Sequence, residues 1–557
     1  MASKLAKKPA APLLSLYAGL AVLLALSLAP LISFFWAAAS AGRSLTEPGS
    51  FLSRVSLGVL WKSLRFTLLQ SAASTALALA IGLPGAWLAA RYEFKGRRIL
   101  LALAAIPFCF PPILVILAFI LYYGREGMLT HFFAFIAGRQ GEYRGLLYSF
   151  WGIVLVHAFY NFPIAVHQIS AHWMRIPSTQ AEAARTLGAG RARAFAVGVA
   201  PQLLPSIVQA GGLIFLYCFF SFTTVLVFGG RAGTTVEVQI YQALRYQSNL
   251  PLAALYALIE TLFALTGIAL LTQRKNGKEA DGRGSDFGQG RRVREKPRGA
   301  ARSLLALYEF LLGIFFLGPL LATVVEAFRV PASLGGGASF GLGNFSRLLG
   351  GFQAPLFPAI AATLRLSGLA ALTATLLGLA ASGSLHFLRR AGTGGTLVRA
   401  IELAQWLPMA VSPAILAYGW LFLSSSRATS LALVAAQAAI AWPFVSRSIQ
   451  ASLRALNPKH REAARTLGAS PLRAFVSVEL RTILPSIAAA AAFAFSITAG
   501  DANVPLMLGM SEVETLPLLL YRLTAAYRFN EACAAGLVLG LMTGAVFFLK
   551  EKVIDVA

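Results

Sequence analysis

The 557-residue sequence has few charged residues, only 13% of the total, and only 3 cysteines. Soluble domains carry about 25% charged residues, so this scarcity, together with 57% hydrophobic residues, excludes a soluble fold and indicates an integral membrane protein. Cys109, Cys218 and Cys533 lie in or near apolar segments and show no metal-like spacing. We interpret them as small core hydrophobes, and we predict no disulfide and no metal site.

Two motifs of catalysis are also missing. The chain contains no GxxxxGK[ST] phosphate loop and no HExxH zinc motif. We therefore predict that it is not an enzyme, that it binds no cofactor of its own and that it does not hydrolyse ATP. The energy for any transport must then come from a partner.

The positive charge of the chain is large but scattered. The formal net charge is +26, from 48 lysines and arginines against 22 acids, and the basic residues stand in short loops beside apolar runs. This distribution is typical of the cytoplasmic side of a membrane protein, and it does not indicate a nucleic-acid partner. Lys4, Lys7 and Lys8 precede a first apolar run that is too long for a signal peptide, so we place the N-terminus in the cytoplasm.

Long apolar runs recur along the whole chain. A spanning helix needs about 20 mostly apolar residues, and only a helix bonds its own backbone groups inside lipid. We therefore predict an all-α integral membrane protein with about twelve transmembrane helices. The expected spans are 12–36, 66–90, 99–123, 149–170, 206–230 and 250–272 in the first half, and 303–325, 358–384, 400–424, 430–446, 483–510 and 532–549 in the second.

The second half of the chain repeats the first. The octet EAARTLGA at residues 182–189 returns letter for letter at 462–469, and Pro163 matches Pro443 at the same offset of 280. Nearer the start of each half the offset is 301, which locates a 21-residue insertion in the external loop 124–148 of the first half. We predict two six-helix repeats, residues 1–272 and 303–557, joined by a basic, flexible cytoplasmic linker at 273–302.

The repeat also constrains the topology. By our count six spans separate the two copies of the octet, so both copies face the same side of the membrane. Their loops are basic, which makes that side cytoplasmic. The two repeats are therefore expected to be parallel, related by an axis along the membrane normal, with both chain termini in the cytoplasm.

Each copy of the octet is expected to form a short docking helix of about three turns. Start signals precede both copies, at 177–179 and 457–458, and a glycine past the helix end can take the left-handed conformation that closes it. A helix that lies on lipid headgroups needs a suitable composition but no exact order of residues. Two identical octets therefore favour a two-fold protein partner. The predicted docking residues are Glu182, Ala183, Ala184, Gly188, Glu462, Ala463, Ala464 and Gly468.

Both loops carry Glu-Ala-Ala, three residues and Gly, which resembles the signature loop of permease subunits of ATP-binding-cassette (ABC) importers. In that family the loop is a coupling helix held by the ATPase subunit. The resemblance implies a type I ABC importer permease fold in the bacterial inner membrane. It also implies two copies of a separate ABC ATPase carrying ATP and Mg, and an external substrate-binding protein. Residues 198–201 keep only the proline of the family's closing Ile-x-Leu-Pro, and residues 478–481 lack it.

The cargo is less well defined by the sequence. A single chain with two cores resembles the permeases for thiamine and ferric iron, and residues 221–226, 235–244 and 500–501 look most like the thiamine permease. Ferric-iron permeases carry a similar glutamate and tyrosine pattern, so iron is the alternative. A rival of another class is a secondary transporter driven by an ion gradient, which would need several intramembrane acids and has no use for the duplicated octet.

Asp501 lies in an apolar run, where an ionisable side chain is costly and tends to face a cavity or a partner. We predict that it faces the translocation path, where it would suit a cationic cargo such as thiamine. Helix packing, or a turn at the outer end of the span, is the alternative. Ser221, Thr223 and Thr224 lie in the equivalent span of the first repeat, as path residues or as interhelical packing residues.

Overall fold

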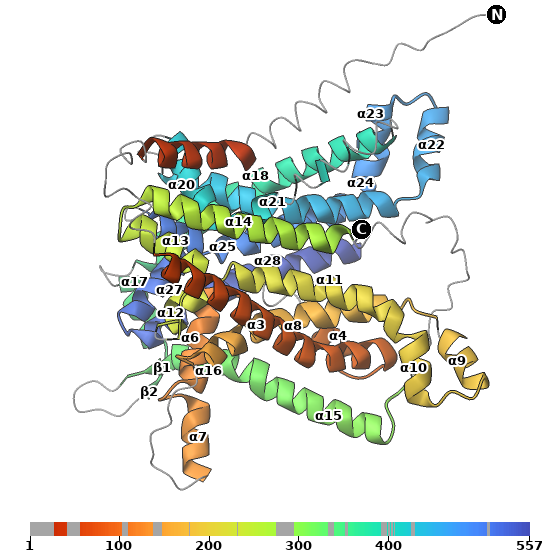
Figure 1. The fold of residues 1–557 in the computed structure, drawn as a ribbon, viewed down its shortest axis with the longest axis horizontal. Helices are drawn as coiled ribbons and strands as arrows, with labels where there is room; N and C mark the ends of the chain where they lie inside the picture. The colour runs from red at the N-terminus through yellow and green to blue at the C-terminus, as the bar shows by residue number, and fades with distance from the viewer. Residues whose placement is uncertain are drawn as a thin grey trace, which may run out of the picture. The chain divides into compact units, whose positions relative to one another are not determined.

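Figure 1 shows the computed structural model of the chain. It describes residues 27–41, 56–102, 110–136, 147–177, 179–230, 232–273, 295–331, 339–350, 355–390, 398, 401–402, 405, 407–424, 429–509 and 513–556. Within these ranges the only sheet is a two-stranded antiparallel one, and the other elements are helices. Most of the predicted linker, residues 274–294, lies outside them.

The first repeat begins with a helix at Ser27–Ala41. Its further helices are α3 (Leu57–Arg91), α4 (Arg97–Ala102), α6 (Pro112–Tyr123), α7 (Met128–Ile136), α8 (Phe150–Trp173), α9 (Thr179–Thr186), α10 (Arg191–Gly198), α11 (Ala200–Phe219), α12 (Thr223–Phe228), α13 (Val236–Arg245) and α14 (Leu250–Gln273).

The second repeat follows a similar order. Its elements are α15 (Ala300–Leu312), the π-helix η4 (Gly313–Leu317), α16 (Gly318–Phe328), β1 (Arg329–Val330), β2 (Ser339–Phe340), α17 (Gly343–Gly350), α18 (Leu356–Arg390), the 3₁₀-helix η5 (Leu407–Met409), α20 (Pro413–Leu423), α21 (Thr429–Ala455), α22 (Pro458–Thr466), α23 (Pro471–Ala474), the π-helix η6 (Phe475–Glu479), α24 (Leu480–Thr482), α25 (Leu484–Ala499), α26 (Asn503–Leu508), α27 (Leu516–Ala525) and α28 (Phe529–Val556).

The described residues contain nine helices that are long and apolar enough to cross a membrane, and ten if the pair Pro471–Thr482 and Leu484–Ala499, bent by 67°, is one span. Three shorter apolar helices, at Ser27–Ala41, α20 and α27, add to these. The prediction of an all-α membrane protein is confirmed. The count of twelve is not reached by length and composition alone in the part of the chain that is described.

The predicted spans 206–230 and 483–510 are not continuous helices, which corrects the sequence prediction. Helix α11 ends at Phe219 and α25 ends at Ala499, and the short helices α12 and α26 follow each break. Hydropathy does not detect such breaks, because the residues on both sides remain apolar. Inside a membrane a break is tolerated only where the freed backbone groups find other partners.

Proline explains where two other spans are divided. Pro112 is the first residue of α6 and Pro413 the first of α20, positions at which the missing N–H of proline costs nothing. The side chain of Ser412 also accepts a hydrogen bond from the N–H of Ala414 at 3.1 Å. The predicted spans 99–123 and 400–424 therefore contain separate helices. Pro107 lies outside the described residues.

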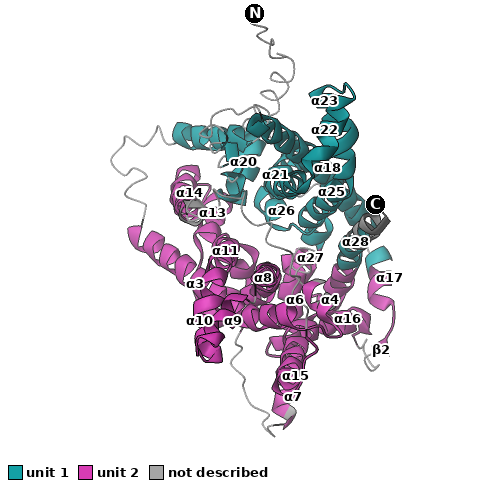
Figure 2. Cartoon of the chain, turned by 90° about the vertical axis from the view of Figure 1, so that its right-hand side faces the viewer, with its two compact units in different colours: residues 1–47, 348–519, 538–557 teal, residues 48–347, 520–537 magenta. Residues whose placement is uncertain are grey.

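The chain forms two compact units, coloured separately in Figure 2. Unit 1 comprises residues 1–47, 348–519 and 538–557, and unit 2 comprises 48–347 and 520–537. Each unit thus holds the first helix of the other sequence repeat. In unit 2 the ring of Phe316 in η4 stacks on Phe159 of α8 at 4.6 Å, and in unit 1 Phe34 stacks on Phe422 of α20 at 6.4 Å. The boundaries of the sequence repeats stay a prediction.

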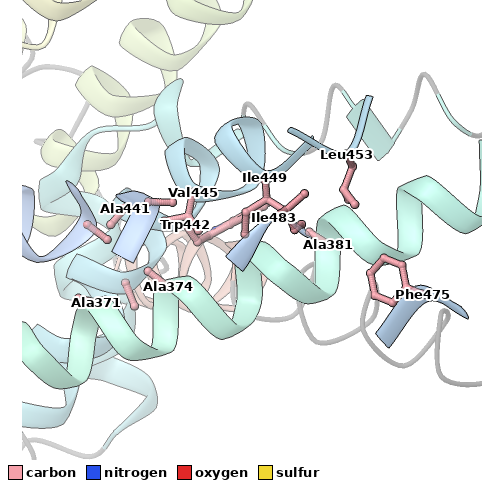
Figure 3. Close-up of a cluster of buried hydrophobic side chains, with 13 residues drawn as sticks. Ala371, Ala374, Ala381, Ala441, Trp442, Val445, Ile449, Leu453, Phe475 and Ile483 are labelled. Atoms are coloured by element: carbon pink, nitrogen blue, oxygen red, sulfur yellow. The ribbon is translucent and has the colours of Figure 1, made fainter. Parts of the chain in front are cut away.

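Glycine allows a close helix contact in each repeat. A Cβ on Gly82 of α3 would lie 2.6 Å from Ala165 Cβ of α8, and a Cβ on Gly378 of α18 would lie 2.7 Å from Val445 Cγ1 of α21. Ala165 and Val445 are equivalent at the offset of 280. Small residues at helix crossings are the usual way in which membrane helices pack closely. Figure 3 shows the apolar cluster that α18, α21 and α25 then enclose.

A hydrolase-like pattern occurs once in the sequence, as GASFG at residues 337–341. Its serine, Ser339, lies in the exposed strand β2 and pairs with Val330. A nucleophile elbow requires a serine at a sharp turn from a strand into a helix at the top of a sheet. The pattern therefore carries no hydrolase site.

Candidate functional site

The octet of the first repeat forms the end of α9 and the turn that closes it. Helix α9 covers Thr179–Thr186, and Gly188 follows with φ of +86°, the left-handed conformation predicted for it. The N–H of Ala189 donates to the carbonyl oxygen of Ala184 at 3.0 Å, and the N–H of Leu187 donates to that of Ala183 at 3.2 Å. The terminal carbonyl groups of the helix are thus bonded.

The octet of the second repeat has the same geometry. Helix α22 covers Pro458–Thr466, and the side chain of Asn457 accepts a hydrogen bond from the N–H of Lys459 at 3.0 Å, as its start signal predicts. Gly468 has φ of +84°, and the N–H of Ala469 donates to Ala464 at 3.1 Å. Both helices are shorter than the predicted three turns, at 8 and 9 residues. Ser178, in the first start signal, lies outside the described residues.

Both octets expose the same face. Neither α9 nor α22 contains a buried residue, and exposure follows the same order along residues 181–190 and 461–470. Glu182 and Glu462 are exposed, and Leu187 and Leu467 are each 89% exposed. An exposed leucine and an exposed carboxylate in each of two identical octets are suited to a groove in another protein, because apolar anchors supply most of the energy of such helix contacts.

A side chain in place of either closing glycine would strain the backbone, and this can be tested. Replacing Gly188 by alanine places a side chain at φ +86°, which costs about 1–2 kcal/mol although no atom lies within 4 Å of the new Cβ. We expect the last turn of α9 to open more often, so that the amides of Leu187 and Ala189 exchange hydrogen about tenfold faster. Gly190→Ala is the control, since Gly190 has φ of −61° and equally open surroundings. Equal exchange in both variants would contradict the strain.

The predicted path residues of the first repeat lie at the break between α11 and α12. Ser221, Thr223 and Thr224 are all buried. The Ser221 hydroxyl makes a 2.7 Å hydrogen bond with His157 Nε2 of α8, and the Ser221 carbonyl accepts one from Thr235 Oγ1 at 3.0 Å. The bond from Thr235 satisfies a backbone carbonyl group at the break, and the bond to His157 ties the break to α8.

Asp501 occupies the equivalent break of the second repeat. Its carboxylate accepts a hydrogen bond from Gln437 Nε2 of α21 at 3.2 Å and one from the N–H of Asn503 at 2.9 Å. Gln437 also donates to the Thr498 carbonyl at 3.2 Å. At the offset of 280, Asp501 matches Ser221 and Gln437 matches His157. One pair of positions therefore ties the break to the neighbouring helix in both repeats.

His157 and Gln437 were not predicted as site residues. Both are buried in spans, where a single polar side chain carries no pattern of its own. The signal that could have found them is the repeat, because the positions that pair with His157 and Ser221 are both polar in the second half.

Comparison with known proteins matches both halves of the chain to one protein family. A family model described as the binding-protein-dependent transport system inner membrane component matches residues 82–273 and again residues 374–550. Each matched segment contains one copy of the octet.

The relatives that match most of the chain share one description. The thiamine transport system permease protein ThiP of Brucella abortus (strain 2308) is 29% identical over 502 residues, covering 88% of each chain. That of Escherichia coli (strain K12) is 28% identical over 508 residues, covering 88% of this chain and 89% of that one. The molybdenum transport system permease protein ModB of Escherichia coli (strain K12) is 30% identical over 222 residues, 38% of this chain and 85% of its own length.

Proposed function

The chain belongs to the family of binding-protein-dependent transport system inner membrane components, and we propose that it is the two-core permease of an ABC importer for thiamine. The family match covers both repeats, so one chain supplies both cores of a multi-pass inner-membrane protein. The observation that carries the mechanism is the pair of exposed octets with the same helix, the same left-handed glycine and the same exposed face.

In this proposal each octet docks into one of two identical ATPase subunits, which bind and hydrolyse ATP with Mg. Closure of an ATPase dimer moves both docking helices together, and such a rigid-body movement switches the access of a transport cavity. A substrate-binding protein delivers the cargo from outside. Both chain termini lie in the cytoplasm, on the side of the octets. A secondary transporter has no part that requires two identical docking helices.

Thiamine is proposed because the relatives that match 88% of the chain are described as thiamine permeases, whereas the molybdenum permease matches 38% of it. That Asp501 faces the translocation path of this cationic cargo stays a prediction. The bonds from Gln437 and Asn503 give it a packing role in addition, and they orient its carboxylate at the break. Ser221, Thr223 and Thr224 likewise stay predictions.

Uptake in cells tests the proposal. A thiamine-requiring bacterial strain without its own thiamine permease would receive this chain together with an ABC ATPase and a substrate-binding protein from the same organism. We expect labelled thiamine uptake that requires ATP, and co-purification of the ATPase in mild detergent. A complex that holds the ATPase but moves ferric iron or molybdate instead would refute the cargo alone. If the chain bound no ATPase and its uptake depended on an ion gradient, it would not be an ABC importer permease.

A further inference from the structure

The two docking helices share the octet EAARTLGA, but different chemistry holds each of them to its repeat. In the first repeat the attachment is neutral. Gln202 of α11 donates to the side chain of Gln180 at 2.6 Å and to the carbonyl oxygen of Gly198 at 2.7 Å. Gly198 lets α10 approach α9 closely, since a Cβ there would lie 3.0 Å from the nitrogen of Ala181.

In the second repeat η6, which packs against the docking helix α22, is joined to α18 by an ion pair. Glu479, at the end of η6, is only 4% exposed. Its carboxylate lies 2.8 Å from Arg390 Nη1 and 3.1 Å from His386 Nε2, both in the last turns of α18. The position equivalent to Glu479 in the first repeat is Val199, so that repeat has no acid there.

An apolar cluster lies one turn before Glu479. Phe475, one turn earlier in η6, lies 5.2 Å from the ring of Phe387 in α18 and belongs to the apolar cluster of α18, α21 and α25. Figure 3 shows Phe475 at one end of this cluster and Ala371 near the other, along the length of α18. Closely packed side chains in a protein interior transmit a displacement instead of absorbing it.

We propose that Glu479 is the positioning residue that transmits movement of the second docking helix to α18. The inference depends on the proposed function. A buried carboxylate bonded to an arginine and a histidine cannot slide past them without leaving its charge unpaired, so η6 and the end of α18 move as one body. The neutral bonds of the first repeat exchange partners more readily, because they hold no buried charge. Two identical ATPase subunits therefore move the two repeats through connections that differ in stiffness.

The complete importer, reconstituted in proteoliposomes with its ATPase and binding protein, tests this role. Glu479→Gln removes the charge but leaves the octet intact, so the ATPase should still co-purify. We expect thiamine uptake per ATP hydrolysed to fall about tenfold. Arg390→Gln, which removes the partner from the α18 side, should produce the same uncoupling. The exchanged pair Glu479→Arg with Arg390→Glu should restore much of the ratio.

Glu402→Gln is the matched control. Glu402 pairs with Arg389 in the last turn of α18 and with Arg454 in the last turn of α21, but its side chain is 37% exposed. Exposed pairs contribute little, so its uptake per ATP should equal that of the wild type. An unchanged ratio in Glu479→Gln would overturn the inference. So would a fall in thermal stability and uptake together that the exchanged pair does not restore. A wild-type chain without bound ATPase would refute the proposed function, and the inference with it.

Discussion

Replacing Gly378 by leucine is expected to separate α18 from α21 and to destabilise unit 1 by about 3 kcal/mol, the upper end of the usual cost of overpacking. The first carbon of any side chain there would lie 2.9 Å from Val445 Cβ and 3.0 Å from the nitrogen of Ser446, and backbone cannot move aside cheaply. The separation would also break the bond from Ser382 Oγ to the Ser446 carbonyl, now 2.9 Å. We expect a lower melting temperature in detergent and a lower yield of monodisperse protein.

The same helix supplies the control for this prediction. Gly368 lies on α18, and a Cβ there would have no atom within 4 Å. Gly368→Leu adds the same volume and removes the same backbone freedom, so it isolates the effect of the helix contact. If Gly378→Leu melted at the temperature of Gly368→Leu, the close crossing of α18 and α21 would not stabilise the unit.

Reversing the charge of both octets, Glu182→Arg with Glu462→Arg, is expected to abolish transport. Each glutamate is exposed near the start or middle of a docking helix, where a partner can bond its carboxylate. Losing one partner of a buried interfacial charge pair costs about 2–5 kcal/mol, so two losses should lower ATPase binding and uptake at least 100-fold. Either single variant should lose less, because the remaining octet still holds the ATPase dimer at high effective concentration. Co-purification and uptake measure both effects.

Glu126→Arg is the control for charge reversal. Glu126 is an exposed carboxylate before α8, whereas the first octet follows that helix, so α8 separates them across the membrane. This variant should retain the ATPase. Normal ATPase binding by the double variant, or an equal loss in Glu126→Arg, would contradict the role of the octets.

Local features of the molecule could be predicted from the sequence because they depend on local rules. Apolar runs indicated the spans, and the positions of Asn457, Gly188 and Gly468 indicated where docking helices begin and end. A cap or a left-handed glycine acts within one turn of its own helix. An exact repeat of eight residues could be found without any knowledge of contacts.

The breaks at Ser221 and Asp501 could not be predicted in the same way. Their stability depends on His157 and Gln437, each 64 residues earlier in the chain. Average hydropathy hides a break whose polar groups are bonded internally. Composition also offered no reason to expect that the first helix of each repeat would join the compact unit of the other.

The amino-acid sequence alone determined that this is a helical membrane protein with two like halves, each carrying one docking helix, because spanning length, caps and duplication are properties of consecutive residues. Only the tertiary structure decided that Glu479 of η6 pairs with Arg390 of α18, whereas Gln202 of α11 bonds to Gln180 of α9. Glu479 and Arg390 are 89 residues apart, and only packing of the folded chain brings their charges together.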